Sequence, residues 1–380
     1  MARTNWAGNL TYRARNFAAP ATVAEVREIV QAVGKVRVVG SRHCFNDIAD
    51  TPDTQISLEH MRNVVALDRE RRQVTVEGGI RYGDLGPWLH ERGFALANLA
   101  SLPHISVAGA TATATHGSGT KVGNLATAVA AIEFVNGDGE LATLSRKDDA
   151  EFPGAVVNLG ALGVVTSLTL DVVPAFEVRQ DLFLDLAAAD LVADFDAIMG
   201  SGYSVSLFTP WTEDRIQQVW VKNVAGDFTP PPALARATRA PKKMHPILHI
   251  DPIHCTEQLG VAGPSYDRLP HFRMGFVPAS GEELQVEYFV PYERASEVVA
   301  AMFGVGEKLK PLLMISELRT VAADDLWLSG SYRRKTIALH FSFQRDEPAL
   351  RKLLPVLEEA IAPFDPRPHW GKGFTMAPDI

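Results

Sequence analysis

The chain has 380 residues, 46% hydrophobic and 22% charged, which is the balance of an ordinary globular protein with room for two domains. No run approaches the roughly 18 apolar residues that a membrane span needs, and the net charge of −8 argues against non-specific binding to nucleic acid. Two cysteines exclude a disulfide framework, and residues 1–10 lack the apolar stretch of a secretion signal, so we expect a cytoplasmic protein.

A short strand that ends in a tight turn is the first stretch with chemical promise. It follows a helix expected over residues 23–33, which a Thr–Glu capping box opens. The strand covers residues 36–39, and Gly40 and Ser41 then turn the chain so that successive backbone N–H groups can face a phosphate. His43 is carried into the same space. Taken alone, the stretch could equally be an ordinary strand-to-loop turn with a histidine that serves packing.

The rest of the first half predicts strands around two further loops of small residues. We expect strands at residues 73–77, 127–135 and 140–144, a glycine turn that leads into a strand within residues 159–172, and a helix that holds residues 85–89 and ends at Gly93. Residues 94–119 are dense in small side chains and nearly free of charge, which lets the backbone approach another group closely. Glycine-rich loops near residues 40, 110 and 160 each adjoin a strand. We expect the first domain to cover residues 1–175.

The second half alternates longer strands and helices, a pattern typical of an antiparallel sheet backed by helices. The expected strands lie at residues 204–208, 216–223, 284–290, 312–321 and 335–343, and the expected helices at residues 184–199, 294–309 and 347–361. Residues 225–253 show prolines, a basic run and little periodicity, so we expect an irregular surface loop there, with a lid over a site as the alternative. A second domain over residues 176–380 follows from this pattern.

Two of these strands each offer a polar face. Alternation along one strand puts Glu317 and Arg319 on the same face, and alternation along the other puts His340 and Ser342 opposite its apolar side chains. If the two faces coincide, they form a pocket suited to a ligand with several hydroxyl groups. The alternative is a solvated outer face, which antiparallel sheets commonly have.

Other sites are weaker or absent from the sequence. Residues 368–372, P-H-W-G-K, pack two basic residues, an aromatic ring and a glycine closely together. We find no phosphate-binding loop of the G-x-x-x-x-G-K type, no zinc-protease motif, no nucleophile elbow and no strand-linked G-x-G-x-x-G. The histidines show no metal-ligand spacing, so we expect neither a Rossmann-bound nucleotide nor a metal.

Several segments occur together in one order along the chain. The first group is G-S-R-H-C-F-N at 40–46, S-L-P-H-I-S-V-A-G with T-H-G-S-G within 101–119, and L-G-A-L-G-V-V-T at 159–166. The second group is N-W-A-G-N at 5–9, Y-S-V-S-L-F-T at 203–209, C-T-E-Q at 255–258, S-E-L-R-T-V-A-A-D at 316–324 and P-H-W-G-K at 368–372. The first group resembles the FAD-binding segments of the vanillyl-alcohol oxidase flavoprotein superfamily, and the second resembles its alditol (xylitol) oxidases. The resemblance covers nearly the whole chain and implies an α+β fold, with an FAD-binding domain of two α+β subdomains and an α+β cap domain built on an antiparallel sheet.

The resemblance also assigns residues to two sites. FAD contacts are implied for Val38, Val39, Gly40, Ser41, Arg42, His43, Cys44, Ser101, Ser106, Gly109, Thr113, Thr115, His116, Gly117 and Val164. Of these, His43 would carry a covalent bond to the 8α-methyl group of the flavin. Substrate contacts are implied for Ser101, Glu317, Arg319, Ser342 and Lys372, and the catalytic residues among them would be Arg319, Lys372 and Glu317.

The implied reaction is FAD-dependent oxidation of the terminal primary alcohol of polyols of the xylitol and sorbitol type. The product would be the aldose, and dioxygen would be reduced to hydrogen peroxide. Arg319 stays protonated and would stabilise the alkoxide-like transition state. Lys372 would act likewise or serve as base. Glu317, Ser101 and Ser342 can form hydrogen bonds with the other substrate hydroxyls.

The chain departs from the family pattern at three points. Arg42 stands where glycine is frequent in the superfamily, and Cys44 where serine is frequent. Relatives continue past the H-W-G-K segment with a stretch that returns to the flavin domain, which we expect this chain to lack. Two competing functions therefore stay open, an aldonolactone oxidase or dehydrogenase of the same superfamily and a truncated, inactive flavin-binding protein. The sequence leaves the oligomeric state open, and a monomer is compatible with it.

Overall fold

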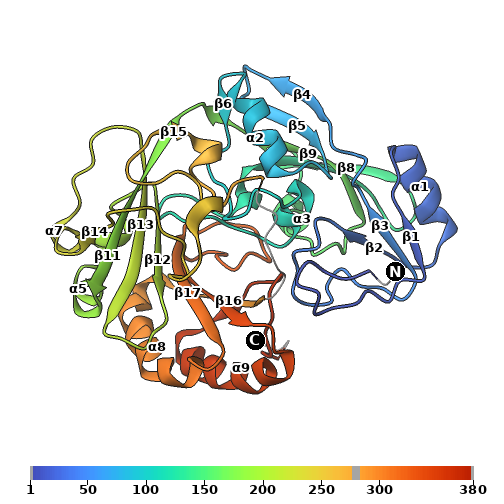
Figure 1. The fold of residues 1–380 in the computed structure, drawn as a ribbon. Coiled ribbons are helices and arrows are strands. Elements are labelled where there is room, and N and C mark those ends of the chain that lie inside the picture. The colour runs from blue at the N-terminus through green and yellow to red at the C-terminus, as the bar shows by residue number, and fades with distance from the viewer. Residues whose placement is uncertain (1–2, 276–282, 378–380) are drawn as a thin grey trace.

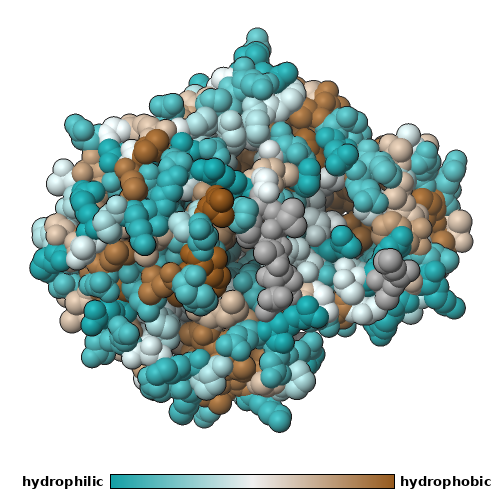
Figure 2. Space-filling model, in the orientation of Figure 1, coloured by the Kyte–Doolittle hydropathy of each residue, from teal (hydrophilic) through white to brown (hydrophobic). Residues whose placement is uncertain are grey.

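A computed structural model describes residues 3–275 and 283–377 of the chain. One large sheet with helices below it occupies one side of the molecule, and two smaller sheets occupy the other side (Figure 1). On the face drawn in Figure 2, apolar residues are interspersed among hydrophilic ones. No helix in the described part of the chain is both long enough and apolar enough to cross a membrane.

The N-terminal sheet is parallel and small. Its strands run in the order β1–β3–β2, and helix α1 packs beside them. The bounds are β1 Asn16–Ala18, α1 Val23–Ala32, β2 Val36–Val39 and β3 Thr54–Ser57. The expected cap of α1 is confirmed, because the Thr22 hydroxyl accepts a hydrogen bond from the Glu25 backbone at 3.2 Å. Val26 and Val30 of α1 bury against Ile56 of the central strand.

The second sheet is antiparallel, in the order β4–β5–β9–β7–β8. The strands expected at residues 127–135 and 140–144 are confirmed as β7 and β8, which pair antiparallel with each other, as β4 and β5 also do. The strands are β4 Val64–Asp68, β5 Gln73–Glu77, β7 Val129–Val135, β8 Leu141–Ser145 and β9 Val164–Asp171, with a separate pair β6 Phe94–Ala95 and β10 Val173–Pro174. The helices here are α2 Tyr82–His90, α3 Val107–Ala112, η1 Leu125–Ala128 and α4 Phe152–Ala155. Leu85 and Leu89 of α2 bury against Val74 and Val76 of β5, so α2 covers one face of this sheet.

The large sheet is built from the second half of the chain. Its order is β14–β11–β13–β12–β17–β18–β16–β19, and β15 pairs with β11. The strands are β11 Glu177–Ala187, β12 Ser204–Thr209, β13 Arg215–Val224, β14 Thr238–Arg239, β15 Gly263–Pro264, β16 Glu283–Pro291, β17 Leu313–Val321, β18 Thr336–Gln344 and β19 Arg367–Pro368. The helices are α5 Ala188–Ala193, α6 Phe195–Met199, α7 Pro232–Ala235, η2 Pro252–His254, η3 Ser265–Asp267, η4 Tyr292–Arg294, α8 Ala295–Leu309, α9 Glu347–Ile361 and η5 Ala362–Phe364.

The two faces of the large sheet differ in character. One face packs on α5, α6, α8 and α9, and the expected apolar row of β18 lies there, including Leu339 and Phe341. The opposite face carries Glu317, Arg319, His340 and Ser342, each less than 9% exposed. The shared polar face is therefore confirmed, whereas the alternative of a solvated face is wrong.

Two expected elements of the second half need correction. The helix expected over residues 184–199 is wrong for its first four residues, which end β11 and pair with β13 from Leu184 to Ala187. Cross-strand pairing over that whole length outweighs the local helical pattern. The irregular segment 225–253 is confirmed in outline, but it holds α7 and β14, the latter paired with β11.

Candidate functional site

The cofactor cradle

A cavity of about 550 Å³ lies where the first glycine loop meets the small-residue segment. It brings together ten of the expected cofactor residues. They are Val38, Val39, Gly40, Ser41, Arg42, His43, Cys44, Ser106, Gly109 and Thr113. The loop that follows β2 and the N-terminus of α3 thus face one space, as the sequence pattern predicts.

The two segments approach too closely for side chains at the contact. A Cβ atom on Gly40 would lie 2.4 Å from the Ser106 hydroxyl oxygen, and one on Gly109 would lie 2.8 Å from the same atom. The Ser41 hydroxyl accepts a hydrogen bond from the Ser106 backbone N–H at 3.2 Å, which ties the loops together. Among the described residues the buried Ser106 hydroxyl has no partner, so it is free to bind a group in the cavity.

His43 stands in this cavity with both ring nitrogens buried and without a partner in the described structure. Its ring stacks on Trp6 with centroids 5.4 Å apart. Burial, together with the nearby Lys372 charge, lowers the pKa of His43 to about 4, so the imidazole is neutral at physiological pH. A neutral, unpaired imidazole nitrogen in a glycine-lined cavity fits a covalent tether to a bound group.

Arg42 adopts a left-handed backbone conformation with φ of 65°. This region disfavours residues that carry a Cβ atom, so a glycine would adopt the conformation at lower cost than arginine does. The exposed guanidinium donates to the Thr4 carbonyl at 3.5 Å.

The third loop reaches the cavity through residues other than the expected one. Asn158, Leu159, Gly160 and Gly163 line the cavity, whereas Val164 lines a neighbouring one of about 450 Å³. Leu159 has a φ of 54°, so the turn brings its backbone toward the cradle.

The polar face of the large sheet

Arg319 lies between two carboxylates at the centre of the polar face. Its Nη2 is 2.7 Å from Glu287 Oε1, and its Nε is 3.6 Å from Glu317 Oε1. Burial opposes the charge of Arg319, but the two carboxylates outweigh burial and raise its pKa. Burial likewise works against both carboxylates, and Arg319 with neighbouring histidines holds the pKa of each below its usual value. All three groups are therefore ionised.

Ser101, Ser342 and Lys372 surround this centre. The Ser101 hydroxyl is 3.4 Å from Arg319 Nη1. Lys372 donates a hydrogen bond to the Gln285 side chain, and Gln285 pairs in register with Ser342 on β18. Burial, reinforced by the charge of Arg319, lowers the pKa of Lys372. The five expected substrate residues thus lie on adjoining strands and the two segments packed against them.

The C-terminal segment joins the polar face to the cradle. The backbone N–H of Phe45 donates to the Gly371 carbonyl at 2.8 Å, two residues from His43. The Asn46 side chain donates to the Trp370 and Lys372 carbonyls at 2.8 and 2.9 Å. On the other side, the Gly373 N–H donates to the Gln285 carbonyl at 2.9 Å. These bonds fix Lys372 between the two halves of the site.

Besides Val164, four expected cofactor residues lie outside the lining of the cavity, namely Ser101, Thr115, His116 and Gly117. Thr115 is 3.2 Å from the Thr113 hydroxyl, and Gly117 packs against Asn98 so tightly that a Cβ atom would lie 2.2 Å from its oxygen. His116 points to the polar face instead, with Nε2 3.0 Å from Glu287 Oε1.

Two histidines and Glu287 bring metal-ligating side chains close together on the polar face. His116, Glu287 and His369 place one potential ligand atom each within 4.8 Å of one another. The same Glu287 oxygen is within hydrogen-bond distance of both His116 and Arg319. That carboxylate is therefore already engaged by protein groups, and we assign the cluster to the polar network.

Similar proteins

Two protein families match parts of the chain. The FAD binding domain family matches residues 14–145, and the D-arabinono-1,4-lactone oxidase family matches residues 280–379. An alditol oxidase of Streptomyces sp. is 45% identical over 377 residues, covering 98% of this chain and 90% of that protein. The chain belongs to the alditol oxidase family. The family lies within the vanillyl-alcohol oxidase superfamily of flavoproteins, so the resemblance of the ordered segments is confirmed.

Similar proteins with other activities share less sequence identity with the chain than the alditol oxidase does. An L-gulono-1,4-lactone dehydrogenase of Mycobacterium tuberculosis is 28% identical over 396 residues, covering 97% of this chain and 89% of that protein. A solved structure of a solvent-stable cholesterol oxidase superposes with a TM-score of 0.75 at 15% identity, covering all of this chain and 88% of that chain. The latter likeness confirms the α+β FAD-binding fold that the alditol oxidase family implies.

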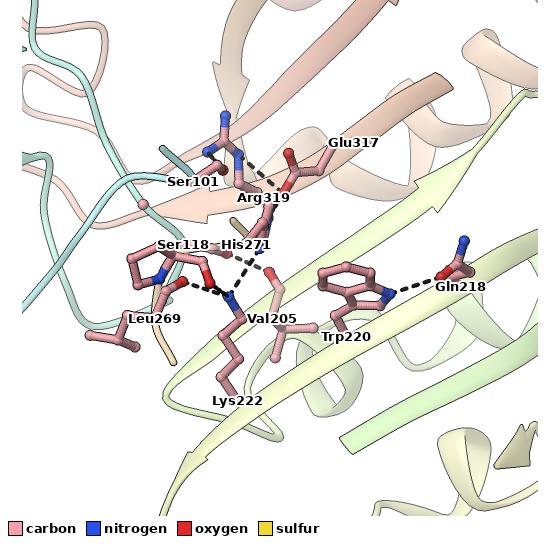
Figure 3. A network of polar contacts seen from close by, with 12 residues as sticks. Ser101, Ser118, Val205, Gln218, Trp220, Lys222, Leu269, His271, Glu317 and Arg319 are labelled. Carbon is pink, nitrogen blue, oxygen red and sulfur yellow. Dashed lines mark hydrogen bonds and ion pairs between the residues drawn. The ribbon is translucent and has the colours of Figure 1, made fainter. Parts of the chain in front are cut away.

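Sequence reasoning about this alditol oxidase family member missed several site residues. Glu287 and Gln285 lie on a strand that was expected, but its neighbours in the sheet could not be known. Asn46 ends the G-S-R-H-C-F-N segment. A side-chain amide at that position was the only sequence signal for its hydrogen bonds to residues 370 and 372. Lys222 and His271 form a buried chain of hydrogen bonds behind Glu317 (Figure 3).

Proposed function

We propose that the protein oxidises the terminal primary alcohol of polyols such as xylitol and sorbitol to the aldose. The cofactor is FAD, and dioxygen is reduced to hydrogen peroxide. The observation that carries the proposal is a buried arginine, ionised between two carboxylates, on the sheet face that the C-terminal segment ties to the His43 cradle. Identity of 45% with an alditol oxidase over 98% of the chain supports the substrate class.

The cradle residues would hold FAD, and His43 would carry it covalently. The unpaired ring nitrogens of His43 and the unpaired Ser106 hydroxyl support this, because a bound group would satisfy them. When bound, FAD supplies the acceptor for the hydride that leaves the substrate carbon, and it passes the electrons to dioxygen.

The polar face would bind and polarise the alcohol. Arg319 would lower the pKa of the reacting hydroxyl and stabilise the alkoxide-like transition state through its fixed charge. Glu317 is held as a carboxylate, so it would accept hydrogen bonds from neighbouring hydroxyls. Ser101 and Ser342 would bind hydroxyls further along the polyol.

Two roles fit Lys372. As an ammonium it would add to the electrostatic stabilisation, and as a neutral amine it would accept the hydroxyl proton. The lowered pKa of Lys372 favours the second role. The pH dependence of kcat in Lys372→Arg separates the two, because arginine keeps the charge and cannot accept a proton.

The sheets support a division of labour near residue 175. We propose that residues 1–175 bind FAD and that residues 176–380 carry the substrate residues other than Ser101, since no strand of the first part joins the large sheet within the described residues. Cys44 and Cys255 are both free thiols, which agrees with a reducing, cytoplasmic location.

The absorbance spectrum of the purified protein tests the function. We expect the flavin bands to bleach on anaerobic addition of xylitol or sorbitol, and peroxide to appear when air is admitted. Bleaching by aldonolactones and not by polyols would move the protein to the lactone oxidases. Flavin that no member of the panel bleaches would favour the inactive flavin-binding protein.

Acid precipitation tests the covalent tether. We expect the wild-type pellet to stay yellow and the His43→Ala pellet to lose its colour to the supernatant. Trp6→Leu is a matched control, because it removes the ring stacked on His43 and leaves the imidazole in place. Colour retained in the His43→Ala pellet would refute the tether.

A further inference from the structure

A chain of hydrogen bonds runs from the interior of the large sheet to Glu317 (Figure 3). Lys222 Nζ is 3.0 Å from His271 Nδ1, and His271 Nε2 is 2.8 Å from Glu317 Oε1. Lys222 lies on β13 and Glu317 on β17, and His271 lies in the segment between η3 and β16. Three parts of the chain that are distant in sequence thus form one line behind the proposed substrate residues.

We propose that Lys222 and His271 are positioning residues, which fix the Glu317 carboxylate as an oriented hydrogen-bond acceptor for the substrate. The proposal rests on the proposed function for its substrate, but the hydrogen-bond chain itself can be tested without turnover.

The chemistry of the three groups fixes the direction of every bond. An ammonium has only donors, so Lys222 must donate and His271 Nδ1 must accept. In the neutral imidazole the proton then sits on Nε2, which donates to the Glu317 carboxylate. The remaining Lys222 donors go to the Leu269 and Pro270 carbonyls, the latter at 3.1 Å. Lys222 therefore fixes the tautomer of His271, and that tautomer places an N–H donor on Nε2 toward Glu317.

All three side chains are buried, so an ammonium and a carboxylate carry a desolvation penalty here. Lys222 is 1% exposed, and His271 and Glu317 are 5% exposed. The ring of Trp220 packs edge-on against His271 with centroids 5.2 Å apart, and Phe208 packs likewise at 5.7 Å. An apolar side chain at position 222 would fill the same space without the desolvation penalty of an ammonium. A packing role alone thus accounts poorly for the lysine.

Lys222 changes its charge close to neutral pH. Burial lowers its pKa to about 7, Arg319 acts in the same direction, and Glu317 with Cys255 opposes them. The other titratable group against it, His271, has its pKa lowered to about 4, and burial raises the pKa of the Cys255 thiol to about 12, so both stay neutral. When Lys222 loses its proton, it can no longer supply all three hydrogen bonds, and the donor to Glu317 weakens.

The pH profile of polyol oxidation distinguishes positioning from packing. We expect kcat/KM of the wild type to fall as pH rises past about 7. In Lys222→Met we expect kcat/KM at neutral pH to be lower by about 10-fold or more, and the decrease above about pH 7 to disappear. Gln218→Met is the matched control. Gln218 lies on the same strand and also donates to backbone carbonyls, those of His245 and Pro246, but it lies beyond Trp220 from His271 and does not contact the Lys222–His271 chain directly (Figure 3). We expect it to lower stability and leave the profile unchanged. A wild-type profile in Lys222→Met would overturn the proposal.

His271 variants and its nitrogen resonances test the chain even if Lys222→Met does not fold. Gln at position 271 can accept from Lys222 and donate to Glu317, so we expect His271→Gln to retain more activity than His271→Leu. Nitrogen-15 NMR of the wild type should show His271 protonated on Nε2 and bare on Nδ1. The opposite tautomer would overturn the proposal whether or not polyols are oxidised, whereas a wild type with the expected tautomer and no polyol oxidation would refute only the proposed function.

Discussion

Arg42 adopts a left-handed backbone conformation that is unfavourable for a residue with a Cβ atom. A left-handed φ costs a residue with a Cβ atom about 1–2 kcal/mol, and the greater freedom of glycine in the unfolded chain returns about 0.4–1 kcal/mol of that. We therefore expect Arg42→Gly to raise the free energy of unfolding by about 0.5–1 kcal/mol in urea. Arg42→Ala keeps the Cβ atom and should stay near the wild type. An equal gain in both variants would show that the guanidinium, rather than the backbone, is the source.

Arg319 is the residue on which the polar face depends most. Arg319→Met leaves Glu287 and Glu317 buried without their counter-charge, so we expect the free energy of unfolding to fall by about 3–5 kcal/mol. We expect xylitol turnover, measured as peroxide release, to fall by about 100-fold or more, which is the effect of losing one hydrogen-bond donor to the transition state.

A double variant separates these two effects of Arg319. Arg319→Met with Glu287→Gln removes one of the stranded charges, so part of the stability should return while turnover stays low. Recovery of turnover in the double variant would contradict an electrostatic role for Arg319.

The face on which a residue lies could be predicted from the sequence where side-chain alternation along a single strand is sufficient. Alternation alone places Glu317 with Arg319 and His340 with Ser342, and the structure has them on one buried face. Glu287, Lys222 and His271 could not be found in this way. Their roles depend on which strands and loops lie beside β17, and a local pattern does not carry that information.

Helix α8 contains two glycines that stand in opposite situations. A Cβ atom on Gly306 would lie 1.8 Å from the Trp211 carbonyl oxygen, whereas one on Gly304 would meet nothing within 4 Å. We expect Gly306→Ala to lower the free energy of unfolding by about 3 kcal/mol, because backbone atoms must move apart. Gly304→Ala is the control in the same helix and should raise it by about 0.5–1 kcal/mol. Equal effects in urea unfolding would contradict this account of how α8 packs.

Elements could be predicted where the signal is local and long. Helix α9 has the bounds expected from its apolar spacing, and β17 and β18 differ from expectation by one residue at each end or less. Strands β1 and β3 were missed, since short strands in a parallel sheet are stabilised by partners distant in sequence. The end of β11 was taken for helix because its antiparallel pairing with β13 cannot be recognised from the local pattern.

At the scale of the molecule, the active arrangement depends on contacts between distant segments. Phe45 and Asn46 bind residues 370–372, and Gly119 donates to the Thr320 carbonyl at 2.8 Å. Such contacts bring the cradle, the small-residue segment and the large sheet to one place. Resemblance to a known family could predict them, whereas composition and periodicity could not.

Buried histidines should make the whole fold sensitive to mild acid. Burial is the main reason that the pKa of His271 is lowered to about 4 and the pKa values of His340 and His369 to about 3. Between those values and about pH 6.5 the unfolded chain binds these protons and the folded chain does not, so stability falls as pH falls. At about pH 5.5 each such histidine lowers the free energy of unfolding by about 1.4 kcal/mol. Glu287 and Glu317 add little between about pH 6.5 and 5.5, because their pKa values are lowered from 4.5 and their effect begins as pH falls toward 4.5.

His369→Asn tests the contribution of one histidine to this acid sensitivity. The His369 Nδ1 accepts a hydrogen bond from the Gly371 backbone at 3.0 Å, and an asparagine oxygen can accept the same bond. We expect the loss of unfolding free energy between about pH 7 and 5.5 to shrink by about 1 kcal/mol in this variant. His249→Asn, at an exposed position, is the matched control and should keep the full loss. If urea unfolding gives the same pH dependence for His369→Asn as for the wild type, the folded protein already carries the proton on His369, and the neutral interior described for the site is wrong.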